Sequence, residues 1–275
     1  MKAFPPSTAR QAGAPSLQPR RFGAVNWIGL GALIGRQIRG GLADYHYQVL
    51  GPVVSCLLDL TIFQLAISTM RGDAGGGLLA FIAPGLIIYA ACEKAYEASA
   101  ATLILDKHER VIFDQLMAPV TAFERSLAYC IGPAVCGLAV GVAVAVMSLI
   151  FAPLRLHDPL ALVFFALAGT VMHGLIGTLV GVWAQKWDQY AAILTFMLLP
   201  LSFLSGVFYR IADLPELAQD VIRFNPIFYV IDGFRHAFTG EGTDIGLAVL
   251  VVAAVDLVLF LWVYLWFRTG YRLKP

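Results

Sequence analysis

The chain has 275 residues, of which 59% are hydrophobic and only 13% are charged, and its mean hydropathy is +0.76. A soluble domain of this length would carry about 25% charged residues, so an ordinary soluble protein is excluded and a protein with several membrane spans is indicated. The formal net charge of +1 excludes nothing by itself. We expect the lipid bilayer, and not nucleic acid, as the surroundings of the chain.

The first 24 residues are rich in proline, serine, glutamine and arginine, and they lack the apolar core of a cleavable signal peptide. We expect residues 1–24 to form a disordered tail in the cytoplasm and residues 25–275 to form a single membrane domain. The cysteines all fall inside apolar segments without the spacing of metal ligands, so we expect buried free thiols and no metal site. These cysteines are Cys56, Cys92, Cys130 and Cys136.

Six stretches of this domain are mostly apolar and roughly 20 residues long or longer, enough to cross a hydrocarbon core of about 30 Å. Unpaired backbone groups are prohibitive in lipid, so each stretch should be a helix and the fold class all-α integral membrane. We expect spans at about 49–69, 78–105, 127–151, 160–184, 190–208 and 245–267.

The basic residues of the connections favour both chain ends in the cytoplasm. This orientation places most of the 19 Lys and Arg residues on the cytoplasmic side, in the N-terminal region, in the connection that follows the second span, and at the C-terminal end. The outer side receives Arg71, Arg155, Arg210, Arg223 and Arg235.

Two further segments predict helices that do not span the membrane. Residues 26–45 predict an amphipathic helix on the inner surface, with Arg36 and Arg39 off its apolar stripe, although its glycines leave a poorly ordered extension as the alternative. Residues 209–244 predict two short helices that dip back into the outer leaflet, separated at Asn225 and Pro226. The apolar stripe of the first segment is Trp27, Leu30, Ile34, Ile38 and Tyr45.

The connection after the second span, DKHERVIFDQLMAPVTAFER, is densely charged in an otherwise apolar chain. Helical projection separates an apolar face from a more charged one. The apolar face contains Ile112, Phe113, Leu116 and Met117, and the charged side contains Lys107, Glu109 and Asp114.

Pro119 predicts the end of this short helix, and Thr121 with Glu124 forms a T-x-x-E capping box that predicts the start of the third span. Residues 106–119 therefore predict a short amphipathic helix with a rigid stop. Such a helix suits docking into a cleft of another protein, and a solvated helix end is the alternative.

Motifs of soluble catalysis are absent from the sequence, which contains no G-K-[ST] phosphate loop, no H-E-x-x-H, no C-x-x-C and no G-x-S-x-G. We therefore expect no enzyme activity in this chain. His173 lies in the fourth span, where we expect a hydrogen bond to a neighbouring helix. Two GxxxG motifs, at residues 137–141 and 177–181, predict close helix packing.

Ionisable residues inside the spans are costly and indicate functional positions. Glu93 and Glu97 are four residues apart and share one face of the second span. They could form a polar patch on a substrate path, or this region could serve structure alone, with Lys94 forming an interhelical ion pair, for example with Asp59. The spacing leaves both interpretations open. For Asp256, in the last span, we expect a carboxylate held by a neighbouring helix.

Four segments resemble ABC transporter permeases of type 2, and most closely the YadH-like, NodJ-like and DrrB-like exporter permeases. The resemblance covers about residues 45–270. The first segment begins a span with PG, continues through a charged turn and ends its short helix with APV. The four segments are PGLIIYAACEKAYEASAATLILDKHERVIFDQLMAPVTAFERSLAY, LHDPL, KWDQYAAILTFMLLPLSFLSGVFYRIADLP and FNPIFYVIDGFRHAF.

The resemblance implies two permeases that work with two copies of a separately made ATP-binding subunit. That subunit would hold ATP and magnesium, so this chain would bind no cofactor directly. The charged connection would be the coupling helix seated in that partner. The residues expected to contact it are Asp106, Lys107, Glu109, Arg110, Phe113, Leu116 and Met117.

The resemblance thus implies the membrane subunit of an ATP-driven exporter in the bacterial inner membrane, and we expect it to work as a homodimer. An ion-coupled secondary transporter is the alternative, but we find none of the internal repeats that such proteins often show. The apolar spans favour a hydrophobic or amphiphilic substrate, such as a lipid, a glycolipid or a drug-like molecule. The residues expected on its path are Glu93, Glu97, Phe196 and Ser202.

Overall fold

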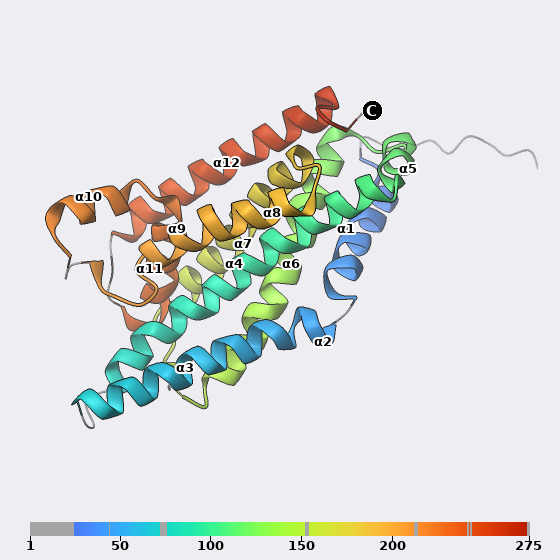
Figure 1. The fold of residues 1–275 in the computed structure, drawn as a ribbon. Helices are drawn as coiled ribbons and strands as arrows, with labels where there is room; N and C mark the ends of the chain where they lie inside the picture. Colours follow the sequence, from blue (N-terminus) through green and yellow to red (C-terminus); the bar gives the residue numbers. More distant parts are fainter. Residues whose placement is uncertain are drawn as a thin grey trace, which may run out of the picture.

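The computed structural model describes residues 25–43, 45–71, 76–151, 154–211, 214–240, 242 and 244–273, and the regular elements of these residues are all helices (Figure 1). Six of the described helical segments are long and apolar enough to cross a membrane, which confirms the predicted number of spans. The predicted tail, residues 1–24, lies outside the described residues. The spans contain α3 (Leu50–Arg71), α4 (Gly76–His108), α6 (Ala122–Ser148), α7 (Pro159–Trp183), α8 (Trp187–Ile193) with the π-helix η2 (Leu194–Leu198) and α9 (Leu199–Leu204), and α12 (Ile245–Thr269).

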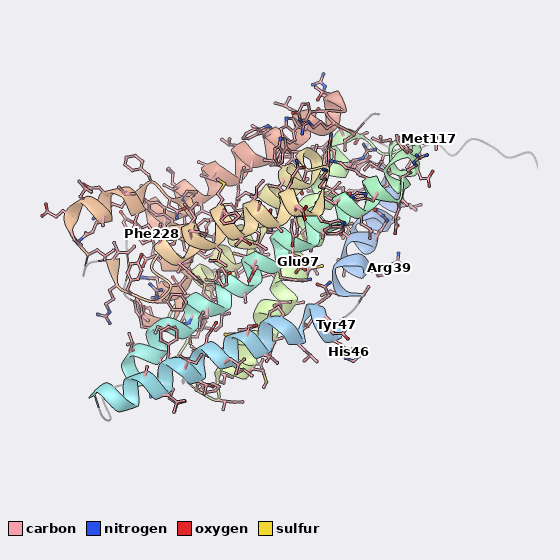
Figure 2. All side chains as sticks on the ribbon, in the orientation of Figure 1. Arg39, His46, Tyr47, Glu97, Met117 and Phe228 are labelled. Atoms are coloured by element: carbon pink, nitrogen blue, oxygen red, sulfur yellow. The ribbon has the colours of Figure 1, made fainter. Side chains whose placement is uncertain are left out.

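Short helices mark the two ends of this bundle (Figure 1). At one end, α5 (Val111–Met117) lies close to the C-terminal end of α12. At the other end, α10 (Glu216–Arg223) and α11 (Pro226–Thr239) follow α9. We call these the α5 end and the α11 end. Figure 2 shows Met117 at the α5 end, Phe228 at the α11 end and Glu97 between them.

Helix α4 is the centre of the bundle, because α6 and α7 pack closely against it through the two GxxxG motifs. A Cβ atom at Gly137 would collide with the carbonyl oxygen of Ala91, and one at Gly177 would collide with Ser99 and the backbone of Tyr96. Close backbone approach of this kind requires glycine and increases van der Waals contact between the helices. The predicted packing role of these motifs is therefore confirmed.

Helix α1 (Trp27–Leu42) forms as predicted, but its buried face differs from the predicted stripe. Leu30, Gln37 and Gly41 are buried, and α1 packs against α6 and α4. Trp27 is 74% exposed, so it points away from this face. The helix also ends before Tyr45, which begins the separate helix α2 (Tyr45–Gln48). The buried face includes a glycine and a glutamine, so the pattern of apolar residues could not predict it.

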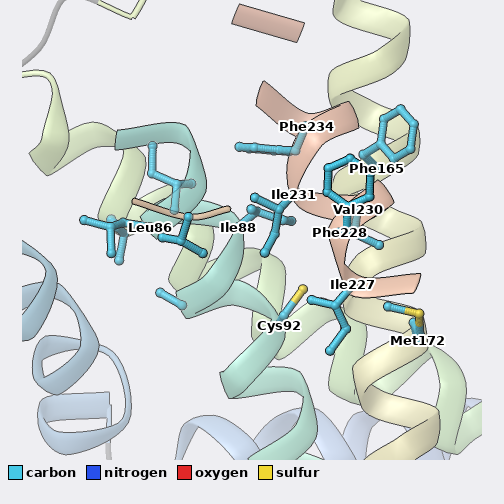
Figure 3. Packing of buried hydrophobic residues seen from close by; sticks show 14 of the residues in the cluster. Leu86, Ile88, Cys92, Phe165, Met172, Ile227, Phe228, Val230, Ile231 and Phe234 are labelled. Carbon is cyan, nitrogen blue, oxygen red and sulfur yellow. The ribbon is translucent and has the colours of Figure 1, made fainter. Parts of the chain in front are cut away.

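The two short helices at the α11 end have different environments. Figure 3 shows Phe228, Ile231 and Phe234 of α11 packed among side chains of α4 and α7. Asn225 caps α11 through the backbone N–H of Ile227, which confirms the predicted break. By contrast, α10 buries only Ile222 and exposes Leu217 and Val221, and Phe224 just after it is 90% exposed. The predicted dip of these helices into a leaflet stays a prediction.

Candidate functional site

The charged connection after α4 is built differently from the single helix that its sequence predicted. Helix α4 continues to His108, and Arg110 then adopts a left-handed conformation with φ 61° before α5 begins. Helix α5 ends at Met117, and extended backbone at Ala118 leads into Pro119 as expected. The prediction of one helix over residues 106–119 is therefore wrong, because the turn at Arg110 divides it into the end of α4 and a separate α5.

A buried polar network attaches α5 to the bundle. The Asp106 carboxylate accepts hydrogen bonds from Arg36 Nη1 at 2.9 Å and from Gln115 Nε2 at 2.6 Å. Arg125 donates to the Gln115 carbonyl oxygen at 2.9 Å, and the Tyr129 hydroxyl lies 3.3 Å from the Gln115 side-chain oxygen. We call these five residues the Asp106 network. It joins α1, α4, α5 and α6, and the hydrogen bond to Asp106 raises the pKa of Arg36.

A second attachment joins the end of α4 to the end of α7. The Lys107 ammonium group donates to the carbonyl oxygens of Gly181 at 2.8 Å and Ala184 at 3.1 Å, and also to that of Val182. Arg272, beyond α12, donates to the Trp183 carbonyl oxygen at 2.8 Å. The last carbonyl groups of a helix have no partner within it, and cations there also complement the helix dipole. Lys107 therefore fixes the C-terminal end of α7.

The turn from α5 into α6 is also fixed. The predicted capping box is confirmed: the Glu124 backbone N–H donates to the Thr121 hydroxyl at 3.2 Å, and the Thr121 N–H donates to the Glu124 carboxylate at 2.7 Å. Asn26, at the start of α1, donates to the Pro119 carbonyl oxygen at 3.0 Å and also to the Glu124 carboxylate. Helix α1 thus contacts both sides of α5.

These attachments leave one face of α5 uncovered. Ile112 and Gln115 are buried and Leu116 is half-buried, whereas Met117 is 77% exposed and Phe113 is exposed. Glu109 and Arg110, in the turn before α5, are exposed as well. The predicted grouping of Ile112 with Met117 on one face is therefore wrong. Of the residues expected to contact a partner, Asp106 is buried and Lys107 is occupied by α7, so neither is available at the surface.

Sequence reasoning missed four members of the Asp106 network: Arg36, Gln115, Arg125 and Tyr129. Gln115 could have been noticed, because a polar residue two positions after Phe113 interrupts the apolar pattern of α5. The other three lie on α1 and α6, far from Asp106 along the chain, so only the packing of the helices reveals their role.

The second candidate site is a polar cavity between α3, α4 and the α8–η2 segment, and it is partly open, since Asp59 is exposed and the Glu97 side chain is 38% exposed. It has a volume of about 300 Å³. The carboxylates of Asp59, Glu93 and Glu97 line it together with Lys94. Figure 2 shows Glu97 between the two ends of the bundle, and Glu93 and Glu97 lie within the candidate span Gly77–His108, where ionisable groups are costly.

Lys94 is bound within the cavity wall. Its side chain is buried, and its ammonium group donates to Glu97 at 3.2 Å and to the side-chain oxygen of Gln48. The suggested ion pair with Asp59 is therefore not formed. Among the described residues, neither Asp59 nor Glu93 forms an ion pair.

Aromatic residues form another wall of this cavity. Tyr96 and Tyr190 stack with their ring centroids 5.6 Å apart and 11° between their planes, and the Tyr96 hydroxyl donates to the Tyr190 carbonyl oxygen at 3.2 Å. Tyr190 and Tyr89 line the cavity. The π-helix η2 begins at Leu194, which also lines it, and short π-helical segments are frequent at functional sites.

A small inner recess continues the cavity past Glu93 and is lined by His173 and Ser202. His173 is 3% exposed, and its Nδ1 atom lies 2.9 Å from the carbonyl oxygen of Gly169 in its own helix. The expected hydrogen bond to a neighbouring helix is therefore replaced by one within α7.

The structure thus brings together three of the four residues expected on a substrate path: Glu93, Glu97 and Ser202. Phe196 is 81% exposed on the outer side of η2 and does not line the cavity. Asp256 lies apart in α12, and its buried Oδ1 atom has no hydrogen-bond partner among the described residues, so the expected interhelical partner is not found.

Six spans, a short helix fixed at one end and a polar cavity within the bundle define a membrane permease. Residues 29–239 match the family described as ABC-2 type transporter, and the chain belongs to that family. It is therefore the permease subunit of an ABC transporter, a family that implies an ATP-binding partner.

The curated relatives agree with this assignment. The chain is 33% identical over 241 residues to the inner membrane transport permease YadH of Escherichia coli (strain K12), and the match covers 86% of this chain and 94% of the relative. The same identity and coverage hold for the permeases of this name in Escherichia coli O157:H7 and Shigella flexneri.

Proposed function

We propose that the chain exports a hydrophobic or amphiphilic substrate, as one of two identical permeases joined to two copies of a separate ATP-binding subunit. The pair lies in the bacterial inner membrane, with both chain ends and α5 in the cytoplasm. ATP and magnesium are held by the partner subunit. The described part of residues 25–275 acts as one membrane domain, and residues 1–24 form a cytoplasmic tail.

The observation that carries this proposal is the way α5 is held. One face of α5 is bound to α1, α4 and α6 through the Asp106 network, and the opposite face exposes Phe113 and Met117. A helix that only capped the bundle would need no apolar side chains on its free face. A helix that seats in a cleft of another protein needs both an apolar anchor and a rigid base.

Rigid attachment also supports a role in transmission. When the ATP-binding subunits close, a force on α5 passes through Asp106 and Lys107 to α4 and α7, and through Gln115 to α6. We therefore assign the contact with the partner to Glu109, Arg110, Phe113 and Met117, with Leu116 at the edge. Asp106 and Lys107 transmit the movement from inside the bundle. Coupling of this kind is a rigid-body change that nucleotide binding in the partner biases.

A second copy is supported by the uneven burial of the spans. Within this chain 78% of the α4 window is buried, compared with 17% for the span that contains α3 and 11% for the span that contains α8 and α9. These two poorly covered spans also form the cavity that contains Glu93 and Glu97. A second copy packed against them would enclose a path between the two permeases.

The experiment compares two exposed apolar residues at opposite ends of the bundle. Met117→Asp places a charge on the free face of α5, whereas Leu217→Asp does the same on α10, where Leu217 is 80% exposed. We expect Met117→Asp to abolish copurification of the ATP-binding subunit from the host membrane, while the permease still inserts. Leu217→Asp should leave the complex intact. If Met117→Asp retains the ATP-binding subunit and ATP-dependent export, the docking role of α5 is wrong.

A further inference from the structure

We propose that the cavity between α3, α4 and η2 binds the cationic group of an amphiphilic substrate, such as a quaternary ammonium or phosphonium ion that carries apolar groups. This inference rests on the proposed function, because it assigns the cavity to the substrate path. It goes further by giving the sign of the substrate's charge. Four features of the cavity support it.

The first feature is an excess of negative charge. Three carboxylates line the cavity and Lys94 is the one basic residue among its lining side chains. Lys94 is already bound to Glu97 and Gln48, so its charge is matched within the wall. Asp59, on α3, and Glu93, on α4, remain without a described cation. A cation that entered between these two helices would supply the missing partner, and an anion would be repelled.

The second feature is the protonation of His173 in the inner recess. Its Nδ1 atom faces the Gly169 carbonyl oxygen at 2.9 Å, so Nδ1 must carry the proton. In the neutral ring, Nε2 is then a hydrogen-bond acceptor. This atom has no described partner, and the residue lines the recess beside Glu93 while being 3% exposed. The partial negative charge of this nitrogen lies apart from the carboxylates and also favours a cation over an anion at the inner end of the cavity.

The third feature is the aromatic wall. Tyr89 and Tyr190 line the cavity, and the Tyr190 ring is held in place by its stacking on Tyr96. Aromatic faces attract cations, and the attraction increases where water is excluded. A quaternary ammonium or phosphonium ion has no N–H donors, so carboxylates and ring faces are the groups that recognise it.

The fourth feature is the apolar surface that surrounds these groups. Leu86 and Leu194 line the same cavity, and its volume of about 300 Å³ can hold a charged group with part of its apolar substituents. The cavity lies between α3 and η2, two segments that are poorly covered within this chain. The apolar remainder of an amphiphile could therefore extend between the helices while its charge stays at Glu93.

The test uses two ions of the same shape and opposite charge, tetraphenylphosphonium and tetraphenylborate, with the detergent-solubilised permease complex. We expect calorimetry to show saturable binding of tetraphenylphosphonium and no binding of tetraphenylborate beyond partition into detergent. Glu93→Gln should weaken tetraphenylphosphonium binding about tenfold or more, equivalent to about 1.4 kcal/mol. The matched control is Asp256→Asn, which neutralises a membrane carboxylate outside the cavity and should leave binding unchanged. Equal binding of the two ions, or an unchanged affinity in Glu93→Gln, would overturn the proposal.

A second measurement does not depend on the folding of an altered carboxylate. Ser55 lines the cavity and is exposed, so Ser55→Cys in a chain whose four cysteines are replaced by alanine provides one reporter thiol there. We expect the trimethylammonium form of a methanethiosulfonate reagent to label this thiol about tenfold faster than the sulfonate form. Tetraphenylphosphonium should slow this labelling. Faster labelling by the anionic reagent, or no protection by the cation, would contradict the proposal.

These outcomes are separable from the proposed export function. Association with the ATP-binding subunit is tested at Met117 on α5, outside the cavity that contains Glu93, and binding of the two ions is measured at the cavity. If the complex assembles and exports but the cavity does not distinguish the two ions, only the charge of the substrate has been assigned wrongly. If the cavity binds the cation but no ATP-binding subunit associates, the export mechanism is wrong.

Discussion

The Asp106 network and the Glu93 cavity are both polar sites in an apolar bundle, but they differ in whether their carboxylates have a cationic partner. In the network, Asp106 accepts from Arg36 and Gln115, and Gln115 is held in turn by Arg125. In the cavity, Lys94 is matched by Glu97, while Glu93 and Asp59 have no described cation. A matched buried charge holds helices together, whereas an unmatched one is a cost that a ligand can remove. The two sites should therefore respond oppositely to neutralisation.

The largest effect is expected from Asp106→Ala, which removes the acceptor shared by α1 and α5. The buried Nε2 group of Gln115 would lose its acceptor, and Arg36, which is partly exposed, would turn towards water. We expect a loss of about 2–3 kcal/mol in the free energy of unfolding, together with loss of coupled ATP hydrolysis. Thermal unfolding in detergent and ATPase activity of the complex measure these two effects.

Asp114→Ala is the matched control for this experiment, because Asp114 is an exposed acid on α5, the helix that Asp106 attaches to the bundle. It should change the unfolding free energy by less than about 0.5 kcal/mol. An equal loss of stability in both variants would mean that Asp106 acts only through the net charge near α5, and the comparison between matched and unmatched sites would fail.

A smaller effect is expected from Lys107→Met, which keeps the aliphatic stem but removes the ammonium group from the carbonyl oxygens of α7. The end of α7 would lose its contacts at Gly181, Val182 and Ala184, although Arg272 would still bind the Trp183 carbonyl oxygen. We expect a loss of about 1–2 kcal/mol, towards the lower end of what a hydrogen bond of a charged group contributes, because Lys107 is partly exposed to solvent. Hydrogen exchange at the end of α7 should increase.

The equivalent change at an exposed lysine distinguishes the effect of the Lys107 hydrogen bonds from the effect of removing any positive charge in this region. Lys186 lies at the N-terminal end of α8 and makes no side-chain capping hydrogen bond. Lys186→Met should leave hydrogen exchange at the end of α7 as it is in the unaltered protein. Faster exchange in that variant would show that the positive charge in this region matters more than the three contacts of Lys107.

The differing success of sequence reasoning at these sites has a physical explanation. The spans, the Thr121 capping box and the Asn225 break depend on local pattern, and the sequence predicted them correctly. The faces of α5 depend on helical phase, which the left-handed turn at Arg110 resets. A left-handed turn is usually marked by glycine in the sequence, and an arginine at this position gives no such sign. Projecting one helix through residues 106–119 therefore placed Met117 on the wrong side.

The cavity could be predicted only in part, for a related reason. Glu93 and Glu97 are conspicuous because charge is rare in spans, and their spacing of one helical turn places them on the same face. Asp59 joins them only through the packing of α3 on α4. Phe196 was a wrong choice for the lining, because apolar side chains that face lipid, a partner or a path look alike in sequence. Its exposure on η2 is visible only in the structure.

The smallest change in stability is expected within the cavity itself. There the carboxylate with a cationic partner, Glu97, and the carboxylate without a described one, Glu93, can be compared directly. Glu97→Gln and Glu93→Gln remove one negative charge each from positions one turn apart on α4. Glu97→Gln leaves the buried Lys94 with Gln48 as its remaining described partner, so we expect a loss of about 1 kcal/mol, reduced by the partial exposure of Glu97. Glu93→Gln breaks no described ion pair, so its unfolding free energy should change by less than about 0.5 kcal/mol or rise slightly.

Binding should show the opposite order in these two variants. Glu93→Gln should lose more affinity for tetraphenylphosphonium than Glu97→Gln, because Glu97 is already matched by Lys94 whereas Glu93 is available to the ligand. Thermal unfolding and calorimetry on the same two preparations measure both quantities. If one variant lost both stability and binding while the other lost neither, a single carboxylate would serve both purposes. The separation between charges that hold the bundle and charges that bind the substrate would then not apply inside this cavity.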